Sequence, residues 1–156
     1  PVGPGITAPV TQTPAPGGGP TGIKFRDTLA GAKAEAAGGA RPVAVVVTGE
    51  ACPPCRRMEA ETYTASPVIE ALNGEFVPVK LVAEQAALEV AALGVNQWPT
   101  TVILDGKTGK EIRRVTGYCG PVEYLAAIRG DPAPRGGRRP VQNLAKAAGR
   151  LLRRGE

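Results

Sequence analysis

Bulky apolar residues in this chain occur in short runs separated by glycine, proline and polar turns, and these runs predict strands alternating with helices. The β-branched run over 42–47 is typical of a strand covered on both faces of a sheet. Further strands are predicted over 76–82, 100–104 and 111–116. Pro78 favours an edge position, because proline cannot donate a hydrogen bond to a neighbouring strand. The turn 105–109 joins the last two strands into a hairpin.

Helical spacing predicts the segments between these strands. A first helix, capped by Asp27, ends at Gly38-Gly39. One face of this helix carries Leu29, Ala32 and Ala36. Later helices are expected over 53–65, 66–74, 84–93 and 121–129. This order predicts an α/β fold, with a mixed central β-sheet flanked by helices on both faces.

Composition divides the chain into a body and two arms. Glycine and proline account for 21 and 16 of the 156 residues, and twelve of these lie within 1–23 and six within 130–140. The predicted parts are a flexible Pro/Gly-rich arm over 1–22, one domain over 23–129, a linker over 130–140 and a helical tail over 141–156.

Charge follows the same division. The net charge of +5 lies in the C-terminal arm, because residues 132–156 hold seven lysines and arginines and one acidic residue, Glu156. The rest of the chain is nearly neutral, so nucleic acid is not an expected partner of the body. Residues 141–154 have the pattern of a basic amphipathic helix. Such a helix folds back on the body, lies solvated, or docks on an acidic protein surface, anionic lipid or nucleic acid of a larger assembly.

Missing residue types and segments exclude several functions. The chain has no histidine, which rules out Ser-His and Cys-His catalysis and metal sites that need imidazole. No apolar run approaches the roughly 20 residues of a membrane span. The sequence begins without a secretory signal, and Pro1 is compatible with removal of an initiator methionine, so a cytoplasmic protein is expected. A trimmed chain that is exported or periplasmic would begin in the same way.

The tetrapeptide Cys52-Pro53-Pro54-Cys55 lies between a predicted buried strand and a helix. Unpaired N–H groups in a first helical turn, together with Arg56 and Arg57, favour a thiolate at Cys52. Cys55 follows three residues later on the same helical face and can close a disulfide. Such a pair exchanges disulfides: Cys52 attacks, and Cys55 resolves the mixed disulfide.

The cysteine pair is also compatible with two roles that involve no exchange. One is half of a zinc site, although the chain has neither a second such pair nor a histidine, so no metal is expected. The second is a pair of inert buried cysteines, and the double proline at a strand-to-helix junction argues against it. No cofactor is expected beyond the redox-active disulfide itself.

Together with this tetrapeptide, the segment Trp98-Pro99-Thr100 resembles the thioredoxin superfamily, over roughly residues 23–129. The resemblance implies a thioredoxin-like fold, with Cys52 as the nucleophile and Cys55 as the resolving thiol. It also implies a cis-proline at Pro99, facing the disulfide.

The same resemblance implies a substrate groove. Backbone groups of the Trp98–Thr100 segment would bind an extended substrate strand, and Gly117 with Tyr118 would form the groove rim. Lys80 matches a lysine that lies beneath the active site in many relatives.

Two positions depart from the family's pattern. Ala51 stands where the family has a tryptophan before the first cysteine. Val46 stands where the family has a buried aspartate that handles the proton of the second thiol. Proton transfer is therefore unassigned. Glu50 and Glu59 are the candidates nearby in the sequence, although such glutamates are most often solvated surface charges.

Cys119, the third cysteine, has two interpretations. The expected one is a small, partly buried residue in the loop before the last helix. The alternative is a rim thiol beside Tyr118 that exchanges with Cys52 or joins a partner chain.

The sequence thus predicts an enzyme, a thiol-disulfide oxidoreductase of cell redox homeostasis that acts on protein disulfides or dithiols and is served by an upstream reductant. The alternative is a structural or interaction protein that uses the thioredoxin-like body as a scaffold and docks through its arms. The redox potential, and with it the direction of exchange, does not follow from the sequence.

Overall fold

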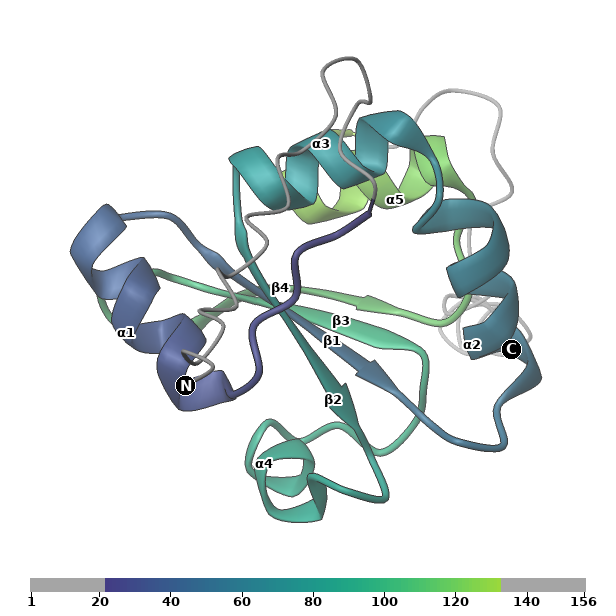
Figure 1. Cartoon of the computed structure of the whole chain (residues 1–156), viewed down its shortest axis with the longest axis horizontal. Helices are drawn as coiled ribbons and strands as arrows, with labels where there is room; N and C mark the ends of the chain where they lie inside the picture. The colour runs from purple at the N-terminus through teal and green to yellow at the C-terminus, as the bar shows by residue number, and fades with distance from the viewer. Residues whose placement is uncertain (1–21, 133–156) are drawn as a thin grey trace, which may run out of the picture.

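Strand β1 (Val43–Thr48) lies inside a four-stranded sheet in the computed structural model, which describes residues 22–132 (Figure 1). The strand order is β2-β1-β3-β4, where the other three strands are β2 (Val77–Val82), β3 (Thr100–Leu104) and β4 (Glu111–Thr116). β1 is parallel to β2 and antiparallel to β3, and β3 is antiparallel to β4. The predicted mixed sheet is therefore confirmed, and all six residues of β1 are buried as its β-branched run indicates.

The edge position predicted from Pro78 is correct. β2 is the outer strand of the sheet, and the Arg26 N–H donates to the Pro78 carbonyl at 2.8 Å from the outside. Arg26 also forms an isolated parallel bridge with Val79. Because the polar groups of Pro78 face outward, β1 loses no hydrogen bond to the proline nitrogen.

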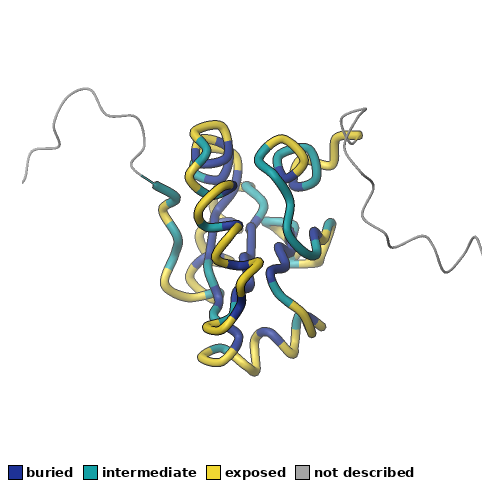
Figure 2. Tube along the Cα trace, turned by 90° about the vertical axis from the view of Figure 1, so that its right-hand side faces the viewer, coloured by how far each residue is buried: buried dark blue, intermediate teal, exposed yellow. Residues whose placement is uncertain are grey.

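Helices cover both faces of the sheet (Figure 1). One face carries α1 (Leu29–Gly39) and α4 (Ala87–Ala92). The other carries α2 (Pro53–Arg57), the π-helical turn η1 (Met58–Thr62), α3 (Ser66–Gly74) and α5 (Pro121–Arg129). Figure 2 shows buried segments between these layers and exposed segments on their outer sides. The predicted α/β class with helices on both faces is confirmed.

The N-cap of α1 differs from the prediction, whereas its C-terminal end agrees with it. The cap is Thr28 rather than Asp27, because Thr28 directly precedes the first helical residue and its Oγ1 accepts the Gly31 N–H at 3.0 Å. The helix ends at Gly39, within the predicted Gly38-Gly39 pair. The left-handed residue that follows is Ala40, with φ of 56°.

Two other predicted helices are interrupted. The helix expected over 53–65 changes after Arg57 into a π-helical turn, in which the Tyr63 N–H donates to the Met58 carbonyl at 2.9 Å. The helix expected over 84–93 is shortened to α4, because the chain must first turn at the end of β2. In that turn the N–H groups of Gln85 and Ala86 both donate to the Val82 carbonyl at 2.9 Å.

The predicted arms lie almost entirely outside the described residues. Gly22 is the one described residue of the predicted arm over 1–22, and the predicted linker is described only as far as Pro132. The predicted basic helix over 141–156 lies beyond them. Within residues 22–132, every helix is too short or too polar to cross a membrane.

Candidate active site

The strand register brings three loops together at one end of the sheet, where β1 and β4 end and β3 begins. Val47, near the end of β1, pairs with Thr100 at the start of β3, and Thr100 pairs with Thr116 at the end of β4. The loop that leaves β1, the loop that enters β3 and the loop that leaves β4 therefore meet. These loops hold the cysteine pair, the Trp98-Pro99 segment and the Gly117–Cys119 segment.

Cys52 and Cys55 form a disulfide, with a distance of 5.2 Å between their Cα atoms. Cys52 is the N-cap of α2, and its Sγ accepts the backbone N–H of Cys55 at 3.3 Å. Pro53 and Pro54 fit the first helical turn, where a missing N–H costs nothing. Both cysteines are buried, with exposed fractions of 5% for Cys52 and 2% for Cys55. The same N–H would stabilise a Cys52 thiolate after reduction.

The Trp98–Pro99 peptide bond is cis and lies beside the disulfide. The carbonyl oxygen of Trp98 is 3.6 Å from Cys52 Sγ. Two hydrogen bonds hold this loop: the Gly117 N–H donates to the Pro99 carbonyl at 2.8 Å, and Thr100 Oγ1 donates to the Gln97 carbonyl at 2.8 Å. Gly117 has φ of 86°, which favours glycine, so the Gly117–Cys119 segment bends sharply where it meets Pro99.

The indole of Trp98 packs on Gly49, in the loop that leads to Cys52. A Cβ atom on Gly49 would lie only 2.3 Å from Trp98 Nε1. The missing side chain of Gly49 therefore makes room for the tryptophan. The sequence prediction assigned a role to Trp98 but missed Gly49, because a contact over 49 positions leaves no local signal.

Arg57, Glu61 and Tyr118 form a cluster that joins the cysteine-bearing segment to the loop after β4. The Arg57 guanidinium lies 4.1 Å from the centre of the Tyr118 ring, and its Nε donates to Glu61 at 3.1 Å. The Tyr118 hydroxyl also donates to Glu61. This hydrogen bond, together with Arg57, lowers the pKa of the Glu61 carboxyl. The same hydrogen bond would be lost if the Tyr118 hydroxyl ionised, so it raises the pKa of Tyr118. Glu61 was not predicted, although its i,i+4 spacing from Arg57 indicates a helical ion pair.

The other predicted charged residues lie on different sides of the cysteine pair. Arg56 is exposed on α2. Glu50 lies in the loop before Cys52, where its carboxylate accepts from Gln85 Nε2 at 3.2 Å. Lys80, on β2, forms an ion pair with Glu59 of η1. The two candidate carboxylates, Glu50 and Glu59, are therefore bound to different partners.

Cys119 is a half-buried free thiol. Its N–H donates to Met58 Sδ at 3.3 Å, and its carbonyl accepts from Thr62 Oγ1 at 2.6 Å. Burial, with a smaller effect of Glu123, raises the pKa of this thiol. At neutral pH the thiol form is therefore favoured over the nucleophilic thiolate.

A family match agrees with this arrangement. Residues 29–130 match the family described as thioredoxin-like domain. The chain belongs to the thioredoxin-like domain family. Its sheet order and its disulfide at the start of a helix are those of a thioredoxin-like fold, and the sequence resemblance is confirmed.

Solved structures of thioredoxin-like proteins are similar over most of the domain. A thioredoxin from Thermus thermophilus is 25% identical, with a TM-score of 0.63 over 70% of this chain and 86% of that chain. The DsbH oxidoreductase is 18% identical, with a TM-score of 0.61 over 70% and 83% of the two chains. Thioredoxin f from spinach chloroplast is 23% identical, with a TM-score of 0.54 over 70% and 93%. At 18% and 23% identity, the last two similarities show a shared fold only. A comparison with curated proteins gives no significant match.

The described residues contain no cluster of side chains that could bind a metal ion. Among residues 22–132, no three side chains of cysteine, aspartate or glutamate gather as a metal site requires. Cys52 and Cys55 bind each other. In the reduced form, the thiols of Cys52 and Cys55 can exchange with a disulfide of another molecule that approaches from the side of Trp98.

Proposed function

We propose that this thioredoxin-like protein is a thiol-disulfide oxidoreductase that acts on protein disulfides or dithiols through Cys52 and Cys55. The observation that supports the proposal most strongly is the position of Cys52. This residue caps α2, accepts the Cys55 N–H at 3.3 Å, and has its sulfur 3.6 Å from the Trp98 carbonyl. Membership of the family and the 25% identity to a thioredoxin support the same activity.

The reaction uses two successive exchanges. In the reduced protein, the Cys52 thiolate attacks one sulfur of a substrate disulfide, and the other substrate sulfur leaves as a thiolate. Cys55 then loses its proton and attacks Cys52 Sγ, which breaks the mixed disulfide and releases the second substrate sulfur. The substrate gains two electrons, and the protein forms the Cys52–Cys55 disulfide. The reverse sequence oxidises a substrate dithiol.

Substrate binding is proposed at the Trp98–Thr100 segment, next to Gly117 and Tyr118. The Trp98 carbonyl can accept from an extended substrate backbone that brings its disulfide to Cys52. Arg56 and Arg57, four and five residues after Cys52, add positive charge that favours its thiolate. An upstream dithiol reductant would return the protein to its reduced form, and the redox potential of the pair decides between reduction and oxidation in the cell.

Trapping tests this function directly. In a full chain with Cys119→Ser, the further change Cys55→Ser should accumulate a mixed disulfide on Cys52 with a disulfide-containing peptide, measured by mass spectrometry. Cys52→Ser in the same background is the matched control and should trap nothing. If Cys55→Ser traps nothing and the parent does not reduce insulin in the presence of dithiothreitol, the proposed function is wrong and the scaffold alternative is favoured.

A further inference from the structure

The resolving step requires a proton to leave a buried thiol. Cys55 has an exposed fraction of only 2%, so its sulfur has little access to solvent water. A thiol becomes a nucleophile only as a thiolate, and proton transfer from a buried group needs an acceptor within hydrogen-bonding distance or one water away. The structure must therefore offer an acceptor near the start of the α2–η1 segment.

β1 offers no such acceptor. Val46 is 1% exposed and pairs with Lys80 on β2 and with Thr101 on β3. Neither a carboxylate nor another basic oxygen stands at this point of the central strand. Lys80 is therefore the charged side chain that the strand register places next to Val46.

Glu59 supplies a carboxylate from η1, which packs over the face of the sheet that carries Lys80. It lies four residues after Cys55, about one turn or 6 Å along a helical axis, and its Oε1 forms an ion pair with Lys80 Nζ. Val77, Val79 and Leu81 belong to the core beneath α1, so alternation places Lys80 on the face beneath α2 and η1. The ion pair thus joins the cysteine-bearing segment to the sheet.

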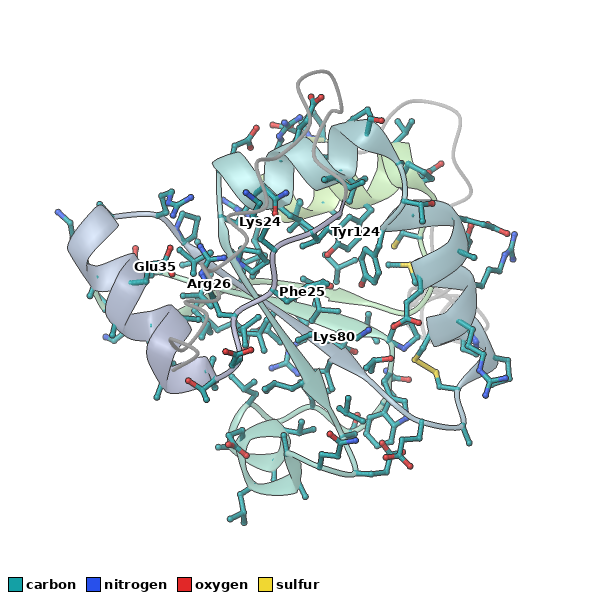
Figure 3. All side chains as sticks on the ribbon, viewed as in Figure 1. Lys24, Phe25, Arg26, Glu35, Lys80 and Tyr124 are labelled. Atoms are coloured by element: carbon teal, nitrogen blue, oxygen red, sulfur yellow. A yellow bond between two sulfur atoms is a disulfide. The ribbon has the colours of Figure 1, made fainter. Side chains whose placement is uncertain are left out.

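The pair also has access to solvent. The side chains of Lys80 and Glu59 are 32% and 43% exposed, so a proton can pass from Glu59 to water. Phe25, from the segment that runs beside β2, lies on Lys80, with Nζ 5.9 Å from the ring centre. Figure 3 labels Lys80 and Phe25 and draws the disulfide in yellow. These contacts hold the Glu59 carboxylate on Lys80, at a place that solvent can reach.

We propose that Glu59, positioned by Lys80, accepts the proton of Cys55 during resolution of the mixed disulfide; this inference rests on the proposed function. The Cys55 S–H bond breaks and its proton passes to the Glu59 carboxylate, directly or through one water. The Cys55 sulfur then forms the bond to Cys52 Sγ while the bond from Cys52 to the substrate breaks. The departing substrate thiolate or water later takes the proton from Glu59. In the oxidising direction, protonated Glu59 returns the proton to Cys55.

The other nearby carboxylates have different partners. Glu50 is exposed before Cys52 and bound to Gln85, and Glu61 is bound to Arg57 and Tyr118. Glu59 is the carboxylate of this segment that is tied to the lysine beside Val46. The ionisable groups that face Glu59 are Lys80 from β2 and Tyr63 at the end of η1.

The test measures the two exchanges separately in full chains that carry Cys119→Ser. Reduced protein is mixed rapidly with an excess of a disulfide-containing peptide, quenched in acid and analysed for mixed disulfide by mass spectrometry. Glu59→Gln should slow resolution at pH 7 on the order of 100-fold, so that the mixed disulfide accumulates. Alkylation of Cys52 by iodoacetamide should change less than about twofold. Glu70→Gln, which removes an exposed carboxylate from α3, is the matched control and should resolve like the parent.

The pH profile separates proton transfer from a structural effect. With Glu59 as acceptor, resolution in the parent should be nearly constant between about pH 6 and 8, because the carboxylate rather than hydroxide removes the thiol proton. Glu59→Gln should gain close to tenfold per pH unit and approach the parent above about pH 9, where hydroxide removes the thiol proton. A parent rate that rises tenfold per unit over this range overturns the inference even if Glu59→Gln fails to fold. Equal resolution by Glu59→Gln and the parent also overturns it and leaves the proposed function intact. A parent that neither forms a mixed disulfide nor releases reduced peptide would refute the function itself.

Discussion

At the scale of single residues, the site depends on close contacts between segments that are distant in the sequence. Gly49 is the clearest case, because its missing side chain leaves the space that the Trp98 indole occupies. Trp98 in turn places its carbonyl 3.6 Å from Cys52 Sγ and precedes the cis bond to Pro99. The geometry around Cys52 therefore depends on a residue that carries no reactive group of its own.

Gly49→Ala should displace Trp98. The new Cβ would lie 2.3 Å from Nε1, so the indole must move outward, at an expected cost of about 1–3 kcal/mol in the free energy of unfolding. Since Trp98 is the only tryptophan of the chain, its fluorescence reports the movement, and a red shift of the emission is expected. Urea unfolding measures the cost.

Gly38→Ala is the matched control for this change. Gly38 lies within α1, and a Cβ atom added to it would meet nothing within 4 Å, so alanine should stabilise the protein by about 0.5–1 kcal/mol. The emission of Trp98 should not change. Unaltered fluorescence and stability in Gly49→Ala would contradict the packing described for Trp98.

At the scale of elements, η1 connects the cysteine-bearing helix to the loop after β4. Thr62 is fully buried, and its Oγ1 donates to the Cys119 carbonyl at 2.6 Å. Met58 Sδ accepts the Cys119 N–H at 3.3 Å from the other end of the same turn. The π-helical turn thus holds both backbone groups of Cys119 and fixes the loop that carries Tyr118. Such turns inside helices frequently occur at functional sites.

Thr62→Val should weaken this connection. Valine has nearly the same shape but cannot donate, so the Cys119 carbonyl loses its partner, at a cost of about 1–3 kcal/mol in the free energy of unfolding. Thr64→Val is the control, because exposed Thr64 donates to the Ala60 carbonyl, which water can reach. It should cost less than about 0.5 kcal/mol. Equal effects in chemical denaturation would show that the buried hydrogen bond does not stabilise η1 and the loop.

At the scale of the whole molecule, the lack of histidine shapes the dependence of stability on pH. Ion pairs and hydrogen bonds lower the pKa of five carboxyl groups: Glu35, Glu61, Glu75, Asp105 and Glu111. Burial acts in the opposite direction on Tyr63 and raises its pKa from 10.0 to about 12. The ionisable groups with shifted pKa values therefore titrate at the acidic and alkaline ends of the pH range.

The oxidised protein should have nearly constant stability between about pH 6 and 8. Carboxyl groups with lowered folded pKa values stabilise the fold above their unfolded values near pH 4, so this stability is lost as the pH falls further. Thermal unfolding followed by circular dichroism from pH 2 to 8 measures the profile. A steep change centred near pH 6.5 would contradict it.

Alkaline pH should destabilise the fold through the buried tyrosine. A raised folded pKa means that the stabilisation is complete below pH 10 and is lost as the pH rises towards 12, by about 2–3 kcal/mol for Tyr63. Tyr63→Phe should remove this part of the slope. At pH 7 it should cost little, because the buried Tyr63 hydroxyl has no hydrogen-bond partner among the described residues. An unchanged alkaline slope in this variant would show that Tyr63 does not titrate with unfolding.

The sequence predicted what depends on neighbouring positions. The apolar run of β1, the edge position of Pro78 and the helix that starts at Pro121 all follow from side-chain type and spacing. The errors also have local causes. Thr28 and Asp27 are both good caps, so backbone conformation alone decides between them. The π-helical turn after Arg57 adds one residue to a helical turn, and residue types do not indicate it.

By itself, then, the sequence determined the class of the fold and the position of the cysteine pair before a helix, because these depend on residues a few positions apart. Tertiary structure decided the partners: Gly49 beneath Trp98, Glu61 between Arg57 and Tyr118, and Glu59 rather than Glu50 on Lys80. Strand register and the packing of η1 on the sheet bring these groups together, and both depend on contacts between segments tens of residues apart.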